Sequence, residues 1–282
     1  LAENATQAVA RDLMALANVS FTTGRESNAQ YGERYNGIQG PAANPRAGRF
    51  DVRVDPYVIR GRPESGRLPY LVQPGDLGQV GAADRRIQSY NYRVCLTDDP
   101  ANRAPIAPPD GYDPARFELL ARWSEARASA GKQLTLRDFL KYDPLQNRKF
   151  DFNNRWAIST DFIGGADRYP AAPPAERARI ARAHEDYLRG FLHFLATSPR
   201  IPETVRSEMS RFGLCRDEFV DNGGWPHQLY VREARRMVSD FVMTEHHCAG
   251  VKVAPRSIGL GAYGVDMHAV RRIAHRGQAI NE

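Results

Sequence analysis

The feature that most constrains the fold is a long amphipathic pattern over residues 175–196, AERARIARAHEDYLRGFLHFLA. Apolar side chains recur in it at helical spacing and form one stripe, which consists of Ile180, Tyr187, Phe191, Phe194 and Leu195. The charged side chains of Arg182, Asp186 and Arg189 fall on the opposite face. The pattern predicts one long helix whose apolar stripe packs against a core.

The two histidines of this pattern lie on different faces. His184 falls on the apolar stripe and His193 on the polar side, so the two imidazoles cannot bind one metal ion. We expect His184 to be a core histidine with a hydrogen-bond partner, because such a histidine is commoner than a metal ligand.

Two other stretches alternate polar and apolar residues, which is typical of half-buried strands. In residues 49–60, Phe50, Val52 and Val54 share one face, and Asp55-Pro56 ends the pattern. Residues 88–97 place Tyr90, Tyr92, Val94 and Leu96 on one face and Asn91, Arg93, Cys95 and Thr97 on the other. Residues 19–23 predict a third, shorter strand that ends at Gly24.

Further helices are expected at residues 115–128 and after Thr135, which is suited to an N-cap with Asp138 three residues later. The proline-rich residues 98–114 predict a surface connection between elements. Together these patterns predict an α+β fold with mixed or antiparallel strands and several amphipathic helices.

Composition excludes several classes of protein. The 282-residue chain has a net charge of +6, but its basic residues are scattered and form no block with interleaved aromatics, so we expect no nucleic-acid partner. No apolar run approaches the ~18 residues of a membrane span. The three cysteines lack metal-site spacing, and their odd number argues against a disulfide framework but allows one bridge. The compartment stays open between bacterial cytoplasm and periplasm.

The stretch DNGGWPHQLYVREARRM, residues 221–237, gathers polar groups in front of a helical pattern. It predicts a helix over residues 229–243, with Pro226 in the first turn and His227 beside it. The positive end of the helix dipole would lower the pKa of His227 and make it a neutral general base. The candidate catalytic residues are His227, Asp221, Asn222 and Gln228. A capped helix with a surface histidine and a packed Trp225 accounts for the same pattern.

Two motifs near the C-terminus resemble known ligand sites. GLGAYG, residues 259–264, matches the dinucleotide fingerprint, but the strand and the chain length that the fingerprint needs are lacking, so we expect a glycine-rich loop that permits close backbone approach. Tyr263, Asp266 and His268 cluster there and either line a pocket or cap the next helix. TEHHC, residues 244–248, has adjacent histidines that point apart, so we predict no metal site and expect it to close the preceding helix.

The polar face of residues 88–97 is a weaker candidate for a binding site. Asn91, Arg93 and Thr97 face either a polar ligand or water, and water is the commoner case for an antiparallel strand.

Several long blocks, in order from about Val19 to the C-terminus, resemble one family. They include VDPYVIRGRPESGRLP, KYDPLQNRKFDFNNRWAISTDFIGG, CRDEFVDNGGWPHQLYVREARRMVSDFVMTEHHC and SIGLGAYGVDMHAV. Together these blocks are similar to the FAD-dependent oxidoreductases sometimes labelled xanthan lyase-like.

The resemblance implies an FAD cofactor and hydride transfer from a substrate C–H bond to the flavin. It also implies that this chain is the central region of such a protein, with no Rossmann-type FAD unit. Residues 1–24 would border the missing FAD-binding domain, and residues 25–282 would form the substrate-side lobe of a two-lobed flavoprotein. The partners would be a small-molecule or saccharide substrate and the missing flavin-binding segments. No cofactor-binding residue is assigned.

In that setting the expected residue roles divide in two. His227 would take a hydroxyl proton, with Asp221, Asn222 and Gln228 orienting it or the substrate. The expected substrate-binding residues are Asn91, Arg93, Arg235, Tyr263 and His268, the two arginines for an anionic group such as a uronate. Three alternatives stay open: a lyase that uses His227 and Tyr263 as base and acid, an inactive orphan lobe, and a stand-alone binding module.

Overall fold

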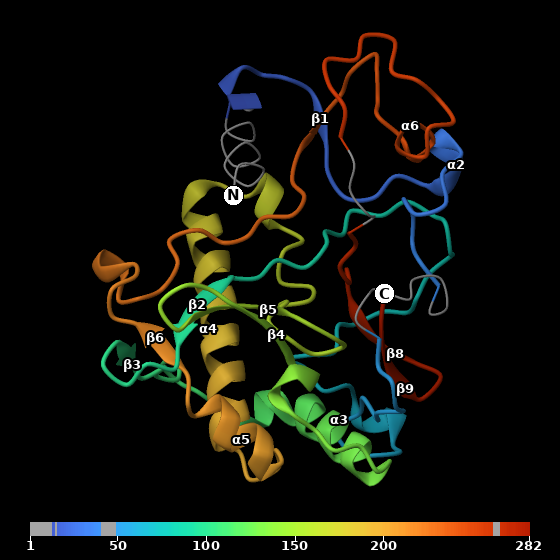
Figure 1. Ribbon diagram of the computed structural model, residues 1–282. Coiled ribbons are helices and arrows are strands. Elements are labelled where there is room, and N and C mark those ends of the chain that lie inside the picture. Colours follow the sequence, from blue (N-terminus) through green and yellow to red (C-terminus); the bar gives the residue numbers. More distant parts are fainter. Residues whose placement is uncertain (1–12, 15, 41–48, 262–265) are drawn as a thin grey trace.

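The computed structural model describes residues 13–14, 16–40, 49–261 and 266–282. Its centre is a five-stranded sheet with the order β3-β6-β2-β5-β4 (Figure 1). The strands are β2 (Val94–Thr97), β3 (Arg103–Ala104), β4 (Leu140–Pro144), β5 (Lys149–Asn154) and β6 (Gly213–Cys215). Each neighbouring pair is antiparallel. The alternation in residues 88–97 therefore predicted a real strand, although the strand covers only the second half of the stretch.

Three helices contribute buried side chains to the same core as this sheet: α3 (Glu118–Ser129), α4 (Pro174–Thr197) and α5 (Glu203–Met209). The long helix α4 runs behind the sheet in the view of Figure 1 and confirms the amphipathic pattern of residues 175–196. Its stripe is buried, and the Tyr187 ring stacks on Phe162 with ring centroids 4.7 Å apart. His184 is a buried core histidine whose Nδ1 donates to the Ile180 carbonyl at 2.8 Å, and burial lowers its pKa to about 4.

The described chain also contains short 3-10 helices. They are η1 (Pro63–Ser65), η2 (Pro114–Phe117), η3 (Leu136–Asp138), η4 (Tyr169–Ala171) and η5 (Val220–Asn222). Asp113 caps η2, which leads directly into α3, so the helix predicted over residues 115–128 is confirmed. The capping box at Thr135 is confirmed, because Asp138 accepts from its backbone N–H at 2.9 Å and its side chain at 3.0 Å. The α-helix expected after it is wrong, since η3 ends at Asp138 and β4 begins at Leu140.

A second region combines segments from both ends of the chain. β1 (Phe21–Thr22) pairs with β7 (Arg236–Met237), and β8 (Arg272–His275) pairs with β9 (Gln278–Asn281). The short helices α2 (Asn28–Tyr31) and α6 (Glu245–Cys248) lie side by side in Figure 1, and Arg34 links them by an ion pair to Glu245. The pairing of β1 confirms the short strand predicted over residues 19–23.

The helix predicted over residues 229–243 is wrong. The segment is extended: Tyr230 donates its backbone N–H to Asn91, and Arg236–Met237 forms β7. Leu229 and Val231 are buried in alternation, whereas Met237 is 57% exposed and Val238 is 58% exposed. The apolar spacing fits both a helix and an extended chain, and pairing with Asn91 and β1 decides between them.

The expectation for TEHHC is wrong as well, because no preceding helix exists for it to close. Thr244 instead starts the separate helix α6, and its hydroxyl pairs with His247 Nδ1 at 2.9 Å.

The strand predicted over residues 49–60 is mostly absent. The alternation correctly buries Val54 and turns Phe50 and Val52 toward the core. Ladder pairing is limited to one bond from Ala279 N–H to the Val54 carbonyl and a single bridge at Tyr57. The polar groups here serve other partners instead, since Asp51 accepts from Trp123 Nε1 at 3.0 Å and from Arg127.

Within the described residues, no helix is both long enough and apolar enough to cross a membrane.

Candidate functional site

A cavity of about 220 Å³ opens where the two ends of the chain meet the middle. Its walls come from the loop after β1, from the extended segment that leads to β7, and from the segments beside β8 and β9. Several charged and amide side chains line it, among them Arg25, Glu26, Gln39, Gln88, Glu233, Arg236, His268 and Glu282. Segments far apart in the sequence thus build one polar cavity.

One residue of the cavity wall, His268, forms a buried pair with Asp161. His268 Nδ1 lies 2.7 Å from Asp161 Oδ2, and the side chains are only 9% and 8% exposed. A carboxylate accepts and cannot donate, so Nδ1 carries the proton and Nε2 is the nitrogen left to exchange one. The Asp266 carboxylate lies 3.4 Å from Nε2 and is largely exposed.

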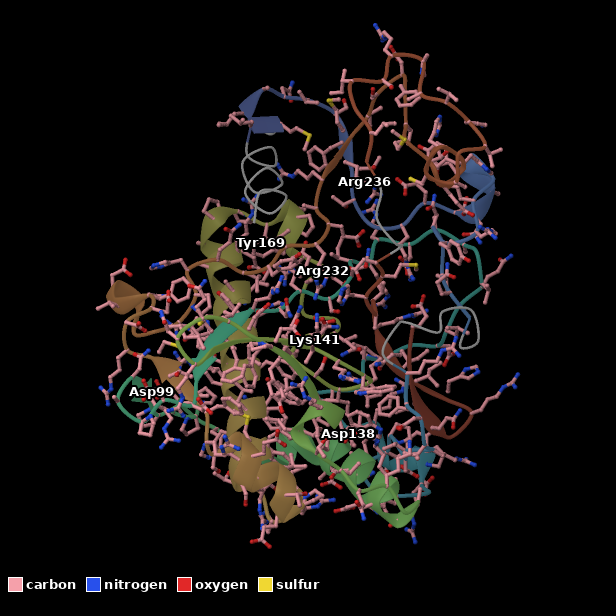
Figure 2. The ribbon with its side chains drawn as sticks, viewed as in Figure 1. Asp99, Asp138, Lys141, Tyr169, Arg232 and Arg236 are labelled. Carbon is pink, nitrogen blue, oxygen red and sulfur yellow. The ribbon has the colours of Figure 1, made fainter. Side chains whose placement is uncertain are left out.

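Arg232 completes a chain of charges behind His268. Its Nη2 donates to Asp161 Oδ1 at 2.8 Å, and its Nε donates to the Ser89 carbonyl at 2.8 Å. Figure 2 shows Arg232 near the centre of the molecule, with Arg236 further along the same extended segment. Both oxygens of Asp161 are therefore held by buried donors.

The neighbouring charges lower the pKa of Asp161 and raise the pKa of His268. Burial alone would raise the pKa of Asp161, but Arg232 and His268 outweigh burial and lower that pKa to about 2. Burial would lower the pKa of His268, but the charge and hydrogen bond of Asp161 raise it above its ordinary value. Asp161 therefore stays ionised at neutral pH and strengthens His268 as a base.

A second carboxyl group lies on the same cavity. Burial raises the pKa of Glu233, whose Oε1 accepts the Gln88 backbone N–H at 2.7 Å. The Gln88 side chain in turn accepts the His268 backbone N–H at 2.8 Å. Gln88 thus fixes both Glu233 and the backbone of His268.

The far wall of the cavity consists of paired charges. Arg25 bonds to Asp84 and Glu282, and both carboxylates raise the pKa of Arg25 although burial opposes this. Arg236 pairs with Glu26 at 2.7 Å. Donors and acceptors therefore face the cavity together, without a field of one sign.

The predicted catalytic corner lies elsewhere, on the surface. His227 Nε2 is 3.1 Å from Asp221 Oδ1, but the two side chains are 54% and 79% exposed. Asn222 donates to the Trp225 carbonyl at 2.9 Å, and Gln228 is exposed. The helix dipole expected at His227 is missing because residues 229–243 are extended. His227, Asp221, Asn222 and Gln228 do not line the cavity at His268.

Asn91 is buried rather than facing water, and it supports the pair from behind. Its Nδ2 donates to Asn153 Oδ1 at 2.9 Å and to Thr160 Oγ1 at 3.0 Å. Asn153 Oδ1 also accepts the backbone N–H of Asn154, whose side chain lies 3.4 Å from His268 Nδ1. Through Asn153 and Asn154, at the end of β5, this amide network connects Asn91 to His268.

The remaining predicted residues are not brought to the cavity. Arg93 is exposed and pairs with Asp151, and Arg235 packs over the Phe21 ring at 4.4 Å. Tyr263 lies outside the described residues. Of the residues predicted for substrate binding that the structure describes, His268 lines the cavity.

The glycine-rich stretch does not behave as expected. Gly259 and Gly261 are exposed, and in the described chain nothing lies within 4 Å of a Cβ built on either. No helix follows Asp266, so His268 lines a pocket instead of capping one.

Sequence reasoning missed Asp161, Arg232, Gln88 and Glu233. Asp161 lies 107 positions from His268, and local pattern carries no signal of that contact. Arg232 lies in residues 229–243, where the sequence pattern predicted a helix that does not form. The adjacency of Asp266 and His268 was the one local signal at this place. Among the described residues, no group of three His, Cys, Asp or Glu side chains is arranged to hold a metal ion.

Comparison with known proteins gives one clear result. No curated protein matches the chain, and no solved structure does. The family model described as FAD dependent oxidoreductase matches residues 9–281, which is nearly the whole chain. The chain therefore belongs to the family of FAD dependent oxidoreductases.

Proposed function

We propose that this chain forms the substrate-side lobe of a flavoprotein oxidoreductase, and that the cavity at His268 binds a small, carbohydrate-derived substrate. The observation that carries the proposal is the contact of 2.7 Å between an ionised Asp161 and Nδ1 of His268, which lines the cavity. A perturbed titratable pair in a pocket is a candidate for proton transfer.

The lining of the cavity supports a hydroxyl-rich ligand. Guanidinium groups, carboxylates and amides alternate around it, so both donors and acceptors are available to the same small molecule. A volume of about 220 Å³ is below the ~300–1,000 Å³ of pockets that bury a drug-sized ligand. One sugar-sized group is the matching class.

The described residues do not fit a whole FAD. The pyrophosphate of a dinucleotide is bound at a glycine-rich turn between a parallel strand and a helix. The pairings of β1 to β9 are antiparallel, and nothing packs against the backbone of Gly259 or Gly261 in the described chain. The cavity of about 220 Å³ is too small for a whole FAD. The proposal therefore assigns the flavin to segments of the same protein beyond this lobe, with residues 1–24 bordering them and residues 25–282 forming the lobe.

Oxidation of an alcohol carbon releases a hydroxyl proton in addition to the hydride. In the proposal the proton goes to Nε2 of neutral His268, while the Nδ1–H bond to Asp161 holds the ring in one orientation. Asp161 stabilises the imidazolium that results. Arg232 and Asn91 act as positioning residues, because their contacts hold Asp161 and its surroundings in place.

His227 stays a predicted base of the surface corner. Its contact with Asp221 also orients an imidazole, but water around this exposed pair screens the charge of Asp221. A lyase-like reaction through His227 and Tyr263 is the alternative function that this corner would serve.

A binding experiment on the full chain tests the proposal. Isothermal titration calorimetry with glucose and with glucuronate should show binding that His268→Ala weakens at least ~10-fold. The matched His227→Ala variant should bind as the wild type does. Equal loss in both variants, or loss in His227→Ala alone, would move the substrate site to the surface corner and refute the proposal.

A further inference from the structure

Two of the three cysteines lie opposite each other on neighbouring strands of the central sheet. β2 pairs with β6 in the register Leu96 to Leu214 and Thr97 to Gly213, which places Cys95 directly opposite Cys215. Their sulfur atoms are 3.7 Å apart. All three cysteines are free thiols, and Cys248 lies exposed on α6. The register and the sulfur contact are independent of the cavity at His268.

This spacing is close to what a disulfide requires. Directly opposite residues of antiparallel strands have Cβ atoms roughly 4.5–5.5 Å apart, and a disulfide needs about 3.5–4.5 Å. The two sulfur atoms need to close from 3.7 Å to about 2.05 Å, which requires rotation of both side chains and a small approach of the two strands. The 120 positions between them make the link a long-range one.

We propose that Cys95 and Cys215 are a site of reversible oxidation and form a cross-strand disulfide with a low-molecular-weight disulfide, such as glutathione disulfide, as the oxidant. Cys95 thiolate attacks one sulfur of the oxidant, and the first glutathione leaves as its thiol. Cys215 thiolate then attacks the Cys95 sulfur, and the second glutathione leaves. The two cysteines lose two electrons and two protons, and the oxidant gains both.

The order of attack follows from access. Cys95 is half-buried, whereas Cys215 is fully buried between β2 and β3, so the oxidant reaches Cys95 first. The buried Cys215 is protected from the bulky oxidant but already touches its partner. The mixed disulfide on Cys95 is therefore short-lived compared with the internal bond.

Both thiols react slowly at neutral pH. Burial raises the pKa of Cys95, and burial together with the neighbouring Cys95 raises the pKa of Cys215 to about 12. The thiolate is the attacking species, so the rate of bond formation should increase with pH.

The test is peptide mapping of the full chain after incubation with glutathione disulfide at pH 8.5, with remaining thiols alkylated. We expect one linked peptide pair that contains Cys95 and Cys215, and no alkylation of either residue. Cys248→Ser should leave that pair unchanged, whereas Cys95→Ser and Cys215→Ser should abolish it. The oxidised chain should melt at least ~5 °C higher, because the bond closes a long loop.

Two outcomes would overturn the proposal. One is a stable glutathione adduct on Cys95 with no internal bond. The other is a bond from either sheet cysteine to Cys248 under native conditions. Both are read from the wild-type map alone, so a variant that fails to fold does not block the decision. Neither depends on the substrate or on the flavin.

Discussion

Two of the histidine–aspartate pairs in the described part of the chain have similar spacing and opposite environments. His268 and Asp161 are buried and 2.7 Å apart, whereas His227 and Asp221 are exposed and 3.1 Å apart. In the buried pair the surroundings lower the pKa of Asp161 to about 2 and raise that of His268. The difference teaches that exclusion of water, more than contact distance, gives such a pair its chemistry.

The largest expected difference between the two pairs is in turnover. In the flavin-containing protein, His268→Ala should reduce kcat for a sugar substrate by about 100- to 10,000-fold, because a positioned base contributes that much. His227→Ala should stay within about 3-fold of the wild type, since an exposed histidine off the cavity loses little transition-state stabilisation. Steady-state kinetics on both variants measures the contrast, and a reversed order would transfer the base to the surface corner.

Stability should separate the pairs next. Asp161→Ala leaves Arg232 buried without its carboxylate, so we expect a loss of about 3–5 kcal/mol in the free energy of unfolding. Asp221→Ala removes a partner from an exposed pair and should change little. Urea unfolding of both variants measures this. A small effect of Asp161→Ala would mean that the buried network is not formed.

Acid should weaken the buried pair at a defined pH. The folded pKa of Asp161 is depressed, so its contribution of about 2 kcal/mol is present above pH ~4 and is lost as pH falls through about 2. His268 has a raised pKa and stabilises in the opposite sense: its contribution is present below pH ~6.5 and is lost as pH rises through its folded pKa. The difference in stability between wild type and Asp161→Asn should therefore shrink between pH 4 and 2. A constant difference would contradict the assignment.

The smallest expected difference is in the stability of two variants of the extended segment that carries Arg232. Val231 is buried and Val238 is exposed because the segment is extended. Val231→Ala should cost about 1–2 kcal/mol, whereas Val238→Ala should cost less than about 0.5 kcal/mol. Thermal unfolding measures both, and a helical segment would make Val238 the more sensitive position.

The sequence predicted those parts of the fold that local periodicity decides. The stripe of α4, the capping box at Thr135 and the strand that contains Val94 all appear where their patterns placed them. The helix predicted over residues 229–243 is wrong because arginines and spaced apolar residues fit a helix and an extended chain equally well. Backbone pairing with Asn91, which is remote in the sequence, made the choice.

The candidate site was less accessible to sequence reasoning. His268 was named, because a histidine beside Asp266 after a glycine-rich stretch is locally unusual. Asp161 was not, because its burial and its contact with His268 are products of tertiary structure. The surface corner at His227 is the stronger candidate from sequence because its polar residues are contiguous, but contiguity in the sequence does not bring them to the cavity.

The most direct test of the central claim is the pH dependence of kcat/KM, which reports the titration of the free enzyme. If neutral His268 takes the proton, the rate should rise through a pKa above about 6.5 in the wild type and His227→Ala alike. Asp161→Asn removes the larger of the two carboxylate effects that raise this pKa, so its profile should shift to lower pH. A profile that Asp161→Asn leaves in place, but that His227→Ala abolishes, would contradict the account.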